Sequence, residues 1–165
     1  MRKTPISATA FVAAAVASLA AMAATPALAL NVSRSAEIAA PPAKVWAAIG
    51  EFCSISDWHP AIEKCVLSKK DGKEIRTLSL KGGGAIIEEQ VSRSDERHNY
   101  TYEILEGPLP VEGYKSTITV RPSGAGSKVI WAGEFKAKGA EDAKAEATIA
   151  GIYEAGLKGI ADKVK

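Results

Sequence analysis

Polar and hydrophobic residues alternate along seven segments that follow residue 30, and this period of two is typical of β-strands. Tyr100, Tyr102 and Ile104 recur at every second position of one such segment, so one face of that strand is expected to be buried. Asp71-Gly72 is a hairpin signal between two of the segments. The predicted strands are residues 31–38, 62–67, 73–80, 85–92, 98–106, 113–121 and 127–137.

Two short helical segments are expected after the first strand. Pro41-Pro42 ends that strand and is a favourable helix start. Apolar residues then follow at intervals of three or four, which predicts a short helix: Val45, Trp46, Ile49 and Phe52. A second small helical or turn segment is expected around residues 54–59.

The C-terminal segment has the period of a longer helix. Beyond Gly139, apolar residues recur three and four positions apart, and charged residues occupy the positions between them. Glu141 and Asp142 at the start suit the positive end of a helix dipole. The pattern predicts one amphipathic helix of about 22 residues.

The order of these elements predicts an α+β fold. We expect a curved, seven-stranded antiparallel sheet that wraps around the long C-terminal helix, with the two short helices after the first strand. Such a sheet and helix cannot close fully on each other, so a cavity is expected between them.

Residues 1–29 have the pattern of a secretory signal peptide. Arg2 and Lys3 form a basic start, residues 10–24 are apolar, and Ala27-Leu28-Ala29 fits a cleavage site. The alternative is an uncleaved membrane anchor, but the apolar stretch is shorter and richer in Ala than the roughly 20 hydrophobic residues of a spanning helix. We therefore expect one periplasmic domain, residues 30–165, with no membrane span after cleavage.

Removal of that segment changes the charge balance. It contains two basic residues and no acidic ones, so Lys and Arg fall from 21 to 19 and equal the 19 Asp and Glu. A neutral domain does not have the basic surface of a nucleic-acid-binding protein.

Cys53 and Cys65 both lie in the expected exported domain, where an oxidising compartment favours a disulfide. A bridge would stabilise the domain by roughly 3 kcal/mol. The alternatives are two buried thiols or a metal pair, although the spacing fits no zinc pattern.

Four motifs carry a resemblance to a known superfamily: Ala39-Ala40-Pro41-Pro42-Ala43-Lys44-Val45-Trp46, Trp58-His59-Pro60, Gly107-Pro108-Leu109-Pro110 and Gly156-Leu157. With the order of elements, they resemble the START-like, helix-grip superfamily (SRPBCC, Bet v 1-like). Its bacterial members are described as polyketide cyclase/dehydrase-like or MxaD-like. The resemblance implies a cavity for a hydrophobic or amphipathic small molecule, with catalysis in only some members.

Three further stretches resemble the plant abscisic acid receptors: Trp46 through Cys65, Asp95-Glu96-Arg97-His98 and Tyr114-Lys115-Ser116. The likeness implies two lid loops, formed by Lys81-Gly82-Gly83-Gly84-Ala85 and by Pro108-Leu109-Pro110-Val111. It places His59 where the receptors have a ligand-pairing lysine. It also makes Glu88, Tyr114 and Ser116 polar pocket residues.

His59 and Glu88 are the candidates for chemistry. His59 can be a cation, donor or acceptor near neutral pH, or it can be a packing corner that caps backbone groups. Alternation does not decide whether Glu88 or Glu89 points inward, and the resemblance favours Glu88. Trp58 and Tyr114 are aromatic candidates for the pocket wall. No nucleophile elbow, metal-ligand cluster or phosphate-binding loop is recognisable, so no metal or other cofactor is expected.

Three functions are compatible with these observations. The first is a periplasmic carrier or sensor of an amphipathic small molecule, contacted by His59, Glu88, Tyr114, Ser116 and Trp58. The second is an accessory protein whose partner is a periplasmic quinoprotein dehydrogenase or a cytochrome, as the MxaD-like resemblance implies. The third, and least favoured, is a cyclase or dehydratase that uses His59 and Glu88 as acid and base.

Overall fold

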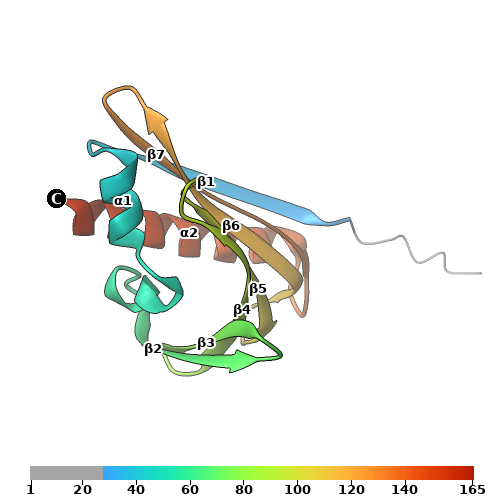
Figure 1. Cartoon of the computed structure of the whole chain (residues 1–165). Helices are drawn as coiled ribbons and strands as arrows, with labels where there is room; N and C mark the ends of the chain where they lie inside the picture. Colours follow the sequence, from blue (N-terminus) through green and yellow to red (C-terminus); the bar gives the residue numbers. More distant parts are fainter. Residues whose placement is uncertain (1–27) are drawn as a thin grey trace, which may run out of the picture.

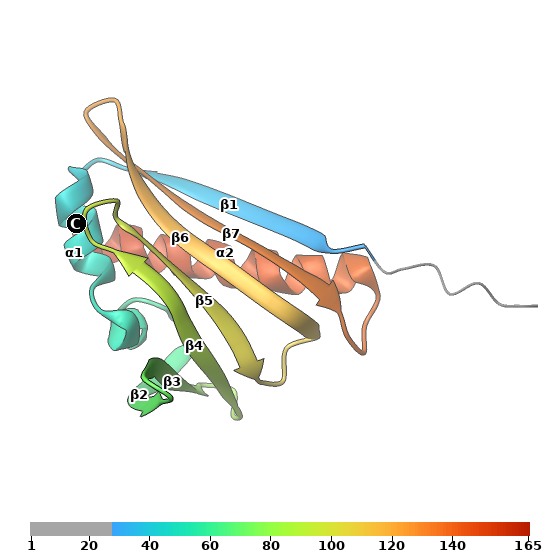
Figure 2. The ribbon, with the colours of Figure 1, turned by 45° about the vertical axis from the view of Figure 1, so that its right-hand side comes forward.

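A computed structural model describes residues 28–165 (Figure 1). Nearly all of the expected signal peptide, residues 1–27, lies outside the described residues. The chain forms a seven-stranded antiparallel sheet in the order β1-β7-β6-β5-β4-β3-β2. The sheet curves around one long helix (Figures 1 and 2), which confirms the predicted α+β helix-grip fold.

The elements lie close to their predicted positions. In chain order they are β1 (Leu30–Ile38), α1 (Pro42–Ile49), the 3-10 helix η1 (Phe52–Asp57), β2 (Ile62–Lys70), β3 (Lys73–Leu80), β4 (Ala85–Ser94), β5 (Asn99–Glu106), β6 (Val111–Ser123), β7 (Gly126–Ala137) and α2 (Asp142–Val164). Among the strands, the largest shift is at the end of β2, which continues to Lys70 instead of residue 67.

The first short helix ends earlier than the apolar spacing predicts. Gly50 has a φ of 69°, and a Cβ atom there would lie 2.7 Å from Ser54 Oγ. Because this conformation strongly favours glycine, the helix ends at Ile49 and the chain changes direction. Phe52 therefore begins η1 instead of continuing α1, although its side chain is buried as expected.

A tight hairpin turn joins β2 to β3. Asp71 and Gly72 both have positive φ, 52° and 80°, as the Asp-Gly hairpin signal predicts. Among the described residues, each strand from β2 to β6 pairs with the next strand along the chain, and β1 pairs with β7. The first and second strands thus form the two edges of the sheet.

Helix α2 lies close to the sheet over β7. The Trp131 ring stacks on the Tyr153 ring with centroids 4.7 Å apart. Gly156 is required here, because a Cβ atom would overlap the Trp131 ring and lie 2.8 Å from His59 Cδ2. This close contact fixes the height of the helix above the sheet.

Cys53 in η1 and Cys65 in β2 form a disulfide, with Cα atoms 5.5 Å apart. The bridge ties the segment before the first hairpin to an edge strand of the sheet. The predicted pairing of the two cysteines is confirmed.

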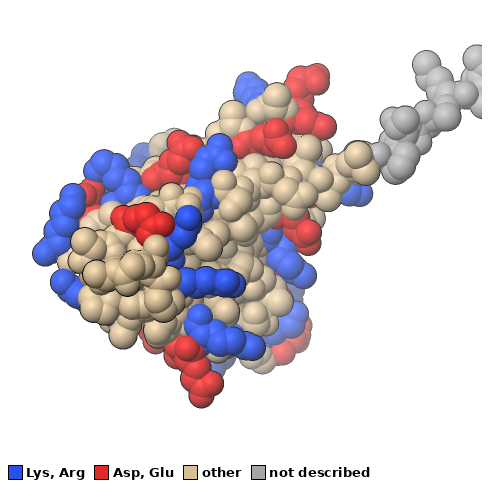
Figure 3. Space-filling view, turned by 90° about the horizontal axis from the view of Figure 1, so that it is seen from above, with Lys and Arg blue, Asp and Glu red and all other residues tan. Residues whose placement is uncertain are grey.

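The described surface carries charges of both signs. On the face in Figure 3, Lys and Arg side chains are interspersed with Asp and Glu, in keeping with the neutral balance of residues 30–165. Within residues 28–165, no helix has the length and apolar character needed to cross a bilayer.

Candidate functional site

A cavity of about 270 Å³ lies between the sheet and α2. Strands β3, β4 and β5 contribute apolar side chains such as Leu78, Ile86 and Ile104, and the helix contributes Ile149 and Ile152. The lining also contains a few polar side chains: His59, Lys81, Glu88, Tyr102, Tyr114 and the indole of Trp131. The expected cavity is therefore present, and its wall is mainly hydrophobic.

The two predicted lid loops meet at the rim of this cavity. Lys81, Gly82 and Gly83 of the β3–β4 turn line it, as does Leu109 of the β5–β6 loop. A Cβ atom at Gly84 would lie 3.8 Å from Pro108 Cγ, so the two loops are neighbours. The other predicted loop residues do not line the cavity: Gly84, Ala85, Pro108, Pro110 and Val111. Opening and closing of the loops stays a prediction.

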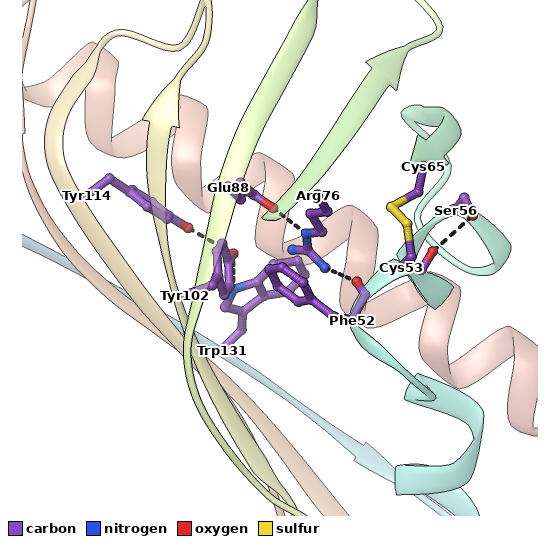
Figure 4. A network of polar contacts seen from close by, with 9 residues as sticks. All are labelled: Phe52, Cys53, Ser56, Cys65, Arg76, Glu88, Tyr102, Tyr114 and Trp131. Carbon is purple, nitrogen blue, oxygen red and sulfur yellow. Dashed lines mark hydrogen bonds and ion pairs between the residues drawn. A yellow bond between two sulfur atoms is a disulfide. The ribbon is translucent and has the colours of Figure 1, made fainter. Parts of the chain in front are cut away.

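Arg76 and Glu88 form a buried ion pair on the sheet wall (Figure 4). The two residues are direct cross-strand partners in β3 and β4, and Arg76 Nε donates to Glu88 Oε2 over 2.5 Å. The Arg76 side chain is closed to solvent, whereas Glu88 is 4% exposed and lines the cavity. Of the two carboxylates that alternation leaves open, Glu88 is the inward one.

The guanidinium of Arg76 is held on three further sides. Its Nη1 donates to the Phe52 carbonyl, and its Cζ lies 4.0 Å above the centre of the Phe52 ring. The Tyr102 ring centre is 5.0 Å away. Such a cation–π arrangement favours the charged guanidinium in a dry site.

Burial acts on both members of the pair. Burial opposes the charge of Arg76, but Glu88 and the neighbouring tyrosines raise its pKa above the ordinary value. Burial raises the pKa of Glu88, and Arg76 works against that rise. Because arginine does not lose its proton, a neutral Glu88 would leave a buried cation without a counter-charge, so we assign Glu88 as a carboxylate.

Four hydroxyl groups form a hydrogen-bonded series, called the hydroxyl chain below: Tyr102, Tyr114, Tyr153 and Ser116. The Trp131 indole donates to Tyr102 Oη over 3.0 Å, and Tyr102 Oη lies 3.2 Å from Tyr114 Oη (Figure 4). Tyr114 Oη lies 2.7 Å from Tyr153 Oη, which lies 2.9 Å from Ser116 Oγ. Ser116 then donates to the Ala132 carbonyl over 2.9 Å.

These tyrosines keep their protons at neutral pH. Burial raises the pKa of Tyr102 and of Tyr114 well above 10.0. It raises the pKa of Tyr153 to about 12. The chain consists of neutral O–H groups, and each can donate one hydrogen bond.

His59 lines the cavity, but both of its ring nitrogens are engaged. Nδ1 accepts from the Ala61 amide over 3.2 Å, and Nε2 lies 3.1 Å from the Ile152 carbonyl in α2. The first contact requires an unprotonated Nδ1, so Nε2 carries the proton and donates. Burial, the largest effect, lowers the pKa of His59. The neutral imidazole therefore joins the η1–β2 corner to the helix.

The family comparison agrees with this geometry. Residues 29–165 match the family described as "Polyketide cyclase / dehydrase and lipid transport". The chain belongs to this family. Comparison with curated proteins gives no match.

Solved structures share the fold. XoxI from Bacillus cereus is 36% identical, with a TM-score of 0.75 over 80% of this chain and 93% of that one. An uncharacterised protein from Bacillus thuringiensis is 34% identical, with a TM-score of 0.76 over 82% of this chain and 98% of that one. The Zhui aromatase/cyclase from Streptomyces sp. R1128 shares the fold at 16% identity, with a TM-score of 0.67 over 83% and 94% of the two chains.

In this polyketide cyclase/dehydrase family member, three of the five predicted pocket residues line the cavity: His59, Glu88 and Tyr114. Ser116 lies behind the wall within the hydroxyl chain. Trp58 also lies behind it, donating to the Ile49 carbonyl over 3.0 Å. Contact of these residues with a ligand stays a prediction.

Sequence reasoning missed two residues, Arg76 and Tyr153. Arg76 alternates with Leu78 and Leu80 on an inward face, which is itself a signal that it needs a buried partner. Tyr153 lies on the apolar stripe of the long helix and is indistinguishable there from a packing residue. Across residues 28–165, no group of three His, Cys, Asp or Glu side chains is placed to hold a metal ion.

Proposed function

We propose that this protein binds one small hydrophobic or amphipathic molecule in the cavity between the sheet and α2. The observation that carries the proposal is the cavity itself, which has about 270 Å³ of space and a largely apolar wall. Concave apolar sites with a few placed polar groups are the usual form of a small-molecule site.

The state of His59 supports binding in preference to acid–base catalysis. Both ring nitrogens are occupied by backbone groups, at Ala61 and at Ile152. A general base needs a free lone pair within reach of its substrate. Glu88 is held through Oε2 by Arg76, which leaves Oε1 as a hydrogen-bond acceptor for a bound molecule.

We further propose that the protein acts in the periplasm after cleavage behind Ala29. The signal-peptide pattern of residues 1–29 and the Cys53–Cys65 disulfide support this location. Expression of the full chain in a Gram-negative host, followed by fractionation and intact-mass measurement, tests it. A periplasmic product that begins at Leu30 is expected, and retention of residues 1–29 in the cytoplasm would contradict it.

Binding can be tested with a matched pair of tryptophan variants in β5. Ile104 lines the cavity, whereas its neighbour Leu105 is 47% exposed and does not line it. Ile104→Trp should fill the space and abolish binding of the fluorescent apolar probe N-phenylnaphthylamine. Leu105→Trp should bind the probe like the wild type.

Circular dichroism should show that both variants are folded. Equal probe binding by the two variants would show that the probe lies outside the cavity. Absence of binding by the wild type itself would remove the support for the proposed function.

A further inference from the structure

The direction of every hydrogen bond in the hydroxyl chain is fixed at one end. The Ala132 carbonyl can only accept, so Ser116 uses its single hydrogen there. Tyr153 must then donate to Ser116, because the serine has no second hydrogen. Tyr153 then has no hydrogen left, so Tyr114 must donate to Tyr153.

The other end agrees with this direction. Tyr114 has used its hydrogen, so Tyr102 must donate to Tyr114. The Trp131 indole can only donate, and it donates to Tyr102. The chain therefore runs one way, and each of the four hydroxyls accepts one hydrogen bond and donates one.

Of the four residues in the hydroxyl chain, Tyr102 and Tyr114 line the cavity. Their hydrogens are consumed within the protein, while each oxygen retains one lone pair. They can accept a hydrogen bond from a ligand, but they cannot donate one to it.

Glu88 has the same character. Within residues 28–165, Arg76 engages only its Oε2, and the residue lines the cavity. Because Glu88 is a carboxylate, its free Oε1 carries no hydrogen and can only accept a hydrogen bond.

The remaining polar groups of the wall add no buried donor. The N–H of Trp131 is used by Tyr102, and that of His59 by the Ile152 carbonyl. Lys81 is the exception among the cavity-lining side chains described in residues 28–165, but it lies exposed in the turn at the rim. The interior thus offers acceptors, one of them charged, to whatever enters.

We infer that the natural ligand is an apolar molecule that carries a hydrogen-bond donor, such as a hydroxyl group, at its buried end. This inference rests on the proposed function and defines the chemistry of that site. A ligand with a carboxylate at its inner end would face the Glu88 carboxylate and the acceptor oxygens of Tyr102 and Tyr114. Arg76 Nη2 is buried and has no hydrogen-bond partner in residues 28–165, but Arg76 does not line the cavity. An ether or ketone at the inner end would therefore find no free donor among the buried cavity-lining side chains.

Unsubstituted naphthalene and three derivatives substituted at the same ring position test this: naphthol, methoxynaphthalene and naphthoate. Isothermal titration calorimetry should show naphthol binding about tenfold more tightly than methoxynaphthalene. Only naphthol has an O–H group that can donate a hydrogen bond to an acceptor such as a carboxylate. Naphthoate should bind most weakly. Equal affinities of naphthol and methoxynaphthalene, or tightest binding of naphthoate, would overturn the inference and leave the binding function in place. Failure of all four to bind would count against both.

A variant of the chain provides a second readout. Tyr102→Phe removes one acceptor and releases the Trp131 N–H as a new donor near the cavity. The preference for naphthol over methoxynaphthalene should fall severalfold or reverse. Thr101→Val is the matched control, because it removes a hydroxyl that pairs with Thr117 outside the cavity lining. If Tyr102→Phe, shown to be folded, keeps the wild-type preference, the acceptor assignment is wrong.

Discussion

Arg76 and Glu88 lie opposite each other, six residues on either side of Gly82, and form an ion pair inside the sheet wall. The same two strands carry a second pair, Lys73 with Glu89, in which the lysine side chain is 60% exposed. One hairpin thus holds a buried ion pair and an exposed one. The two pairs differ mainly in their access to water.

Removal of the buried carboxylate should therefore be costly. Glu88→Gln leaves the Arg76 charge buried with no counter-charge, which is expected to lower the free energy of unfolding by about 3–5 kcal/mol. Glu89→Gln, at the next position of the same strand, should cost at most about 1 kcal/mol. Urea denaturation of the two variants measures the difference, and equal costs would contradict the burial argument.

The glycines of α2 provide a second test, of how closely the helix approaches β7. Gly151 is exposed with nothing within 4 Å of an added Cβ, whereas Gly156 faces Trp131 and His59. Gly151→Ala should stabilise the protein by up to about 1 kcal/mol through helix propensity. Gly156→Ala should destabilise it by about 1–3 kcal/mol through overpacking. Thermal melts compare the two, and stabilisation by both substitutions would show that the helix can move away from the sheet.

The Cys53–Cys65 bridge should contribute to stability and also support the ion pair. The chain between the two residues is short, 12 positions, so a Cys53→Ser, Cys65→Ser variant should lose roughly 3 kcal/mol. The preceding residue, Phe52, also accepts a hydrogen bond from Arg76, so loss of the bridge should loosen that contact. Chemical denaturation of the oxidised protein and the double variant checks the loss. An unchanged free energy of unfolding would mean that the bridge does not constrain the unfolded chain.

The strands and turns of this protein follow from residues that are close together in the sequence. Alternation and turn chemistry predicted all seven strands, because the period of two and the Asp71-Gly72 turn act over a few residues. The end of α1 was missed, since the conformation of Gly50 reflects its closeness to Ser54. The spacing of apolar residues in the sequence does not predict that contact.

The site was only partly accessible to the same reasoning. The burial of Glu88 was predicted by resemblance, but Arg76 as its partner depends on the register of a hairpin centred on Gly82. The hydroxyl chain joins Tyr102, Tyr114 and Tyr153 from two strands and the helix. No local pattern marks residues that meet only in the folded chain.

Finally, the buried histidine should make stability depend on pH. The pKa of His59 is lowered from 6.5, mainly by burial, so the folded chain binds this proton more weakly than the unfolded chain. Between the lowered pKa and 6.5, the unfolded state holds more protons, and the free energy of unfolding falls as the pH falls through that range. Above 6.5 the contribution of His59 is complete.

Glu88, whose pKa burial raises while Arg76 works against that rise, also contributes to the pH dependence. A comparison with His59→Asn separates the two effects, since asparagine keeps an acceptor for the Ala61 amide but does not titrate. Urea denaturation from about pH 8 to about pH 5 should give a steeper loss of stability for the wild type than for the variant. Parallel pH profiles would show that His59 is protonated as readily in the folded protein as in the unfolded chain, and the assigned N–H donation to Ile152 from a neutral ring would then be wrong.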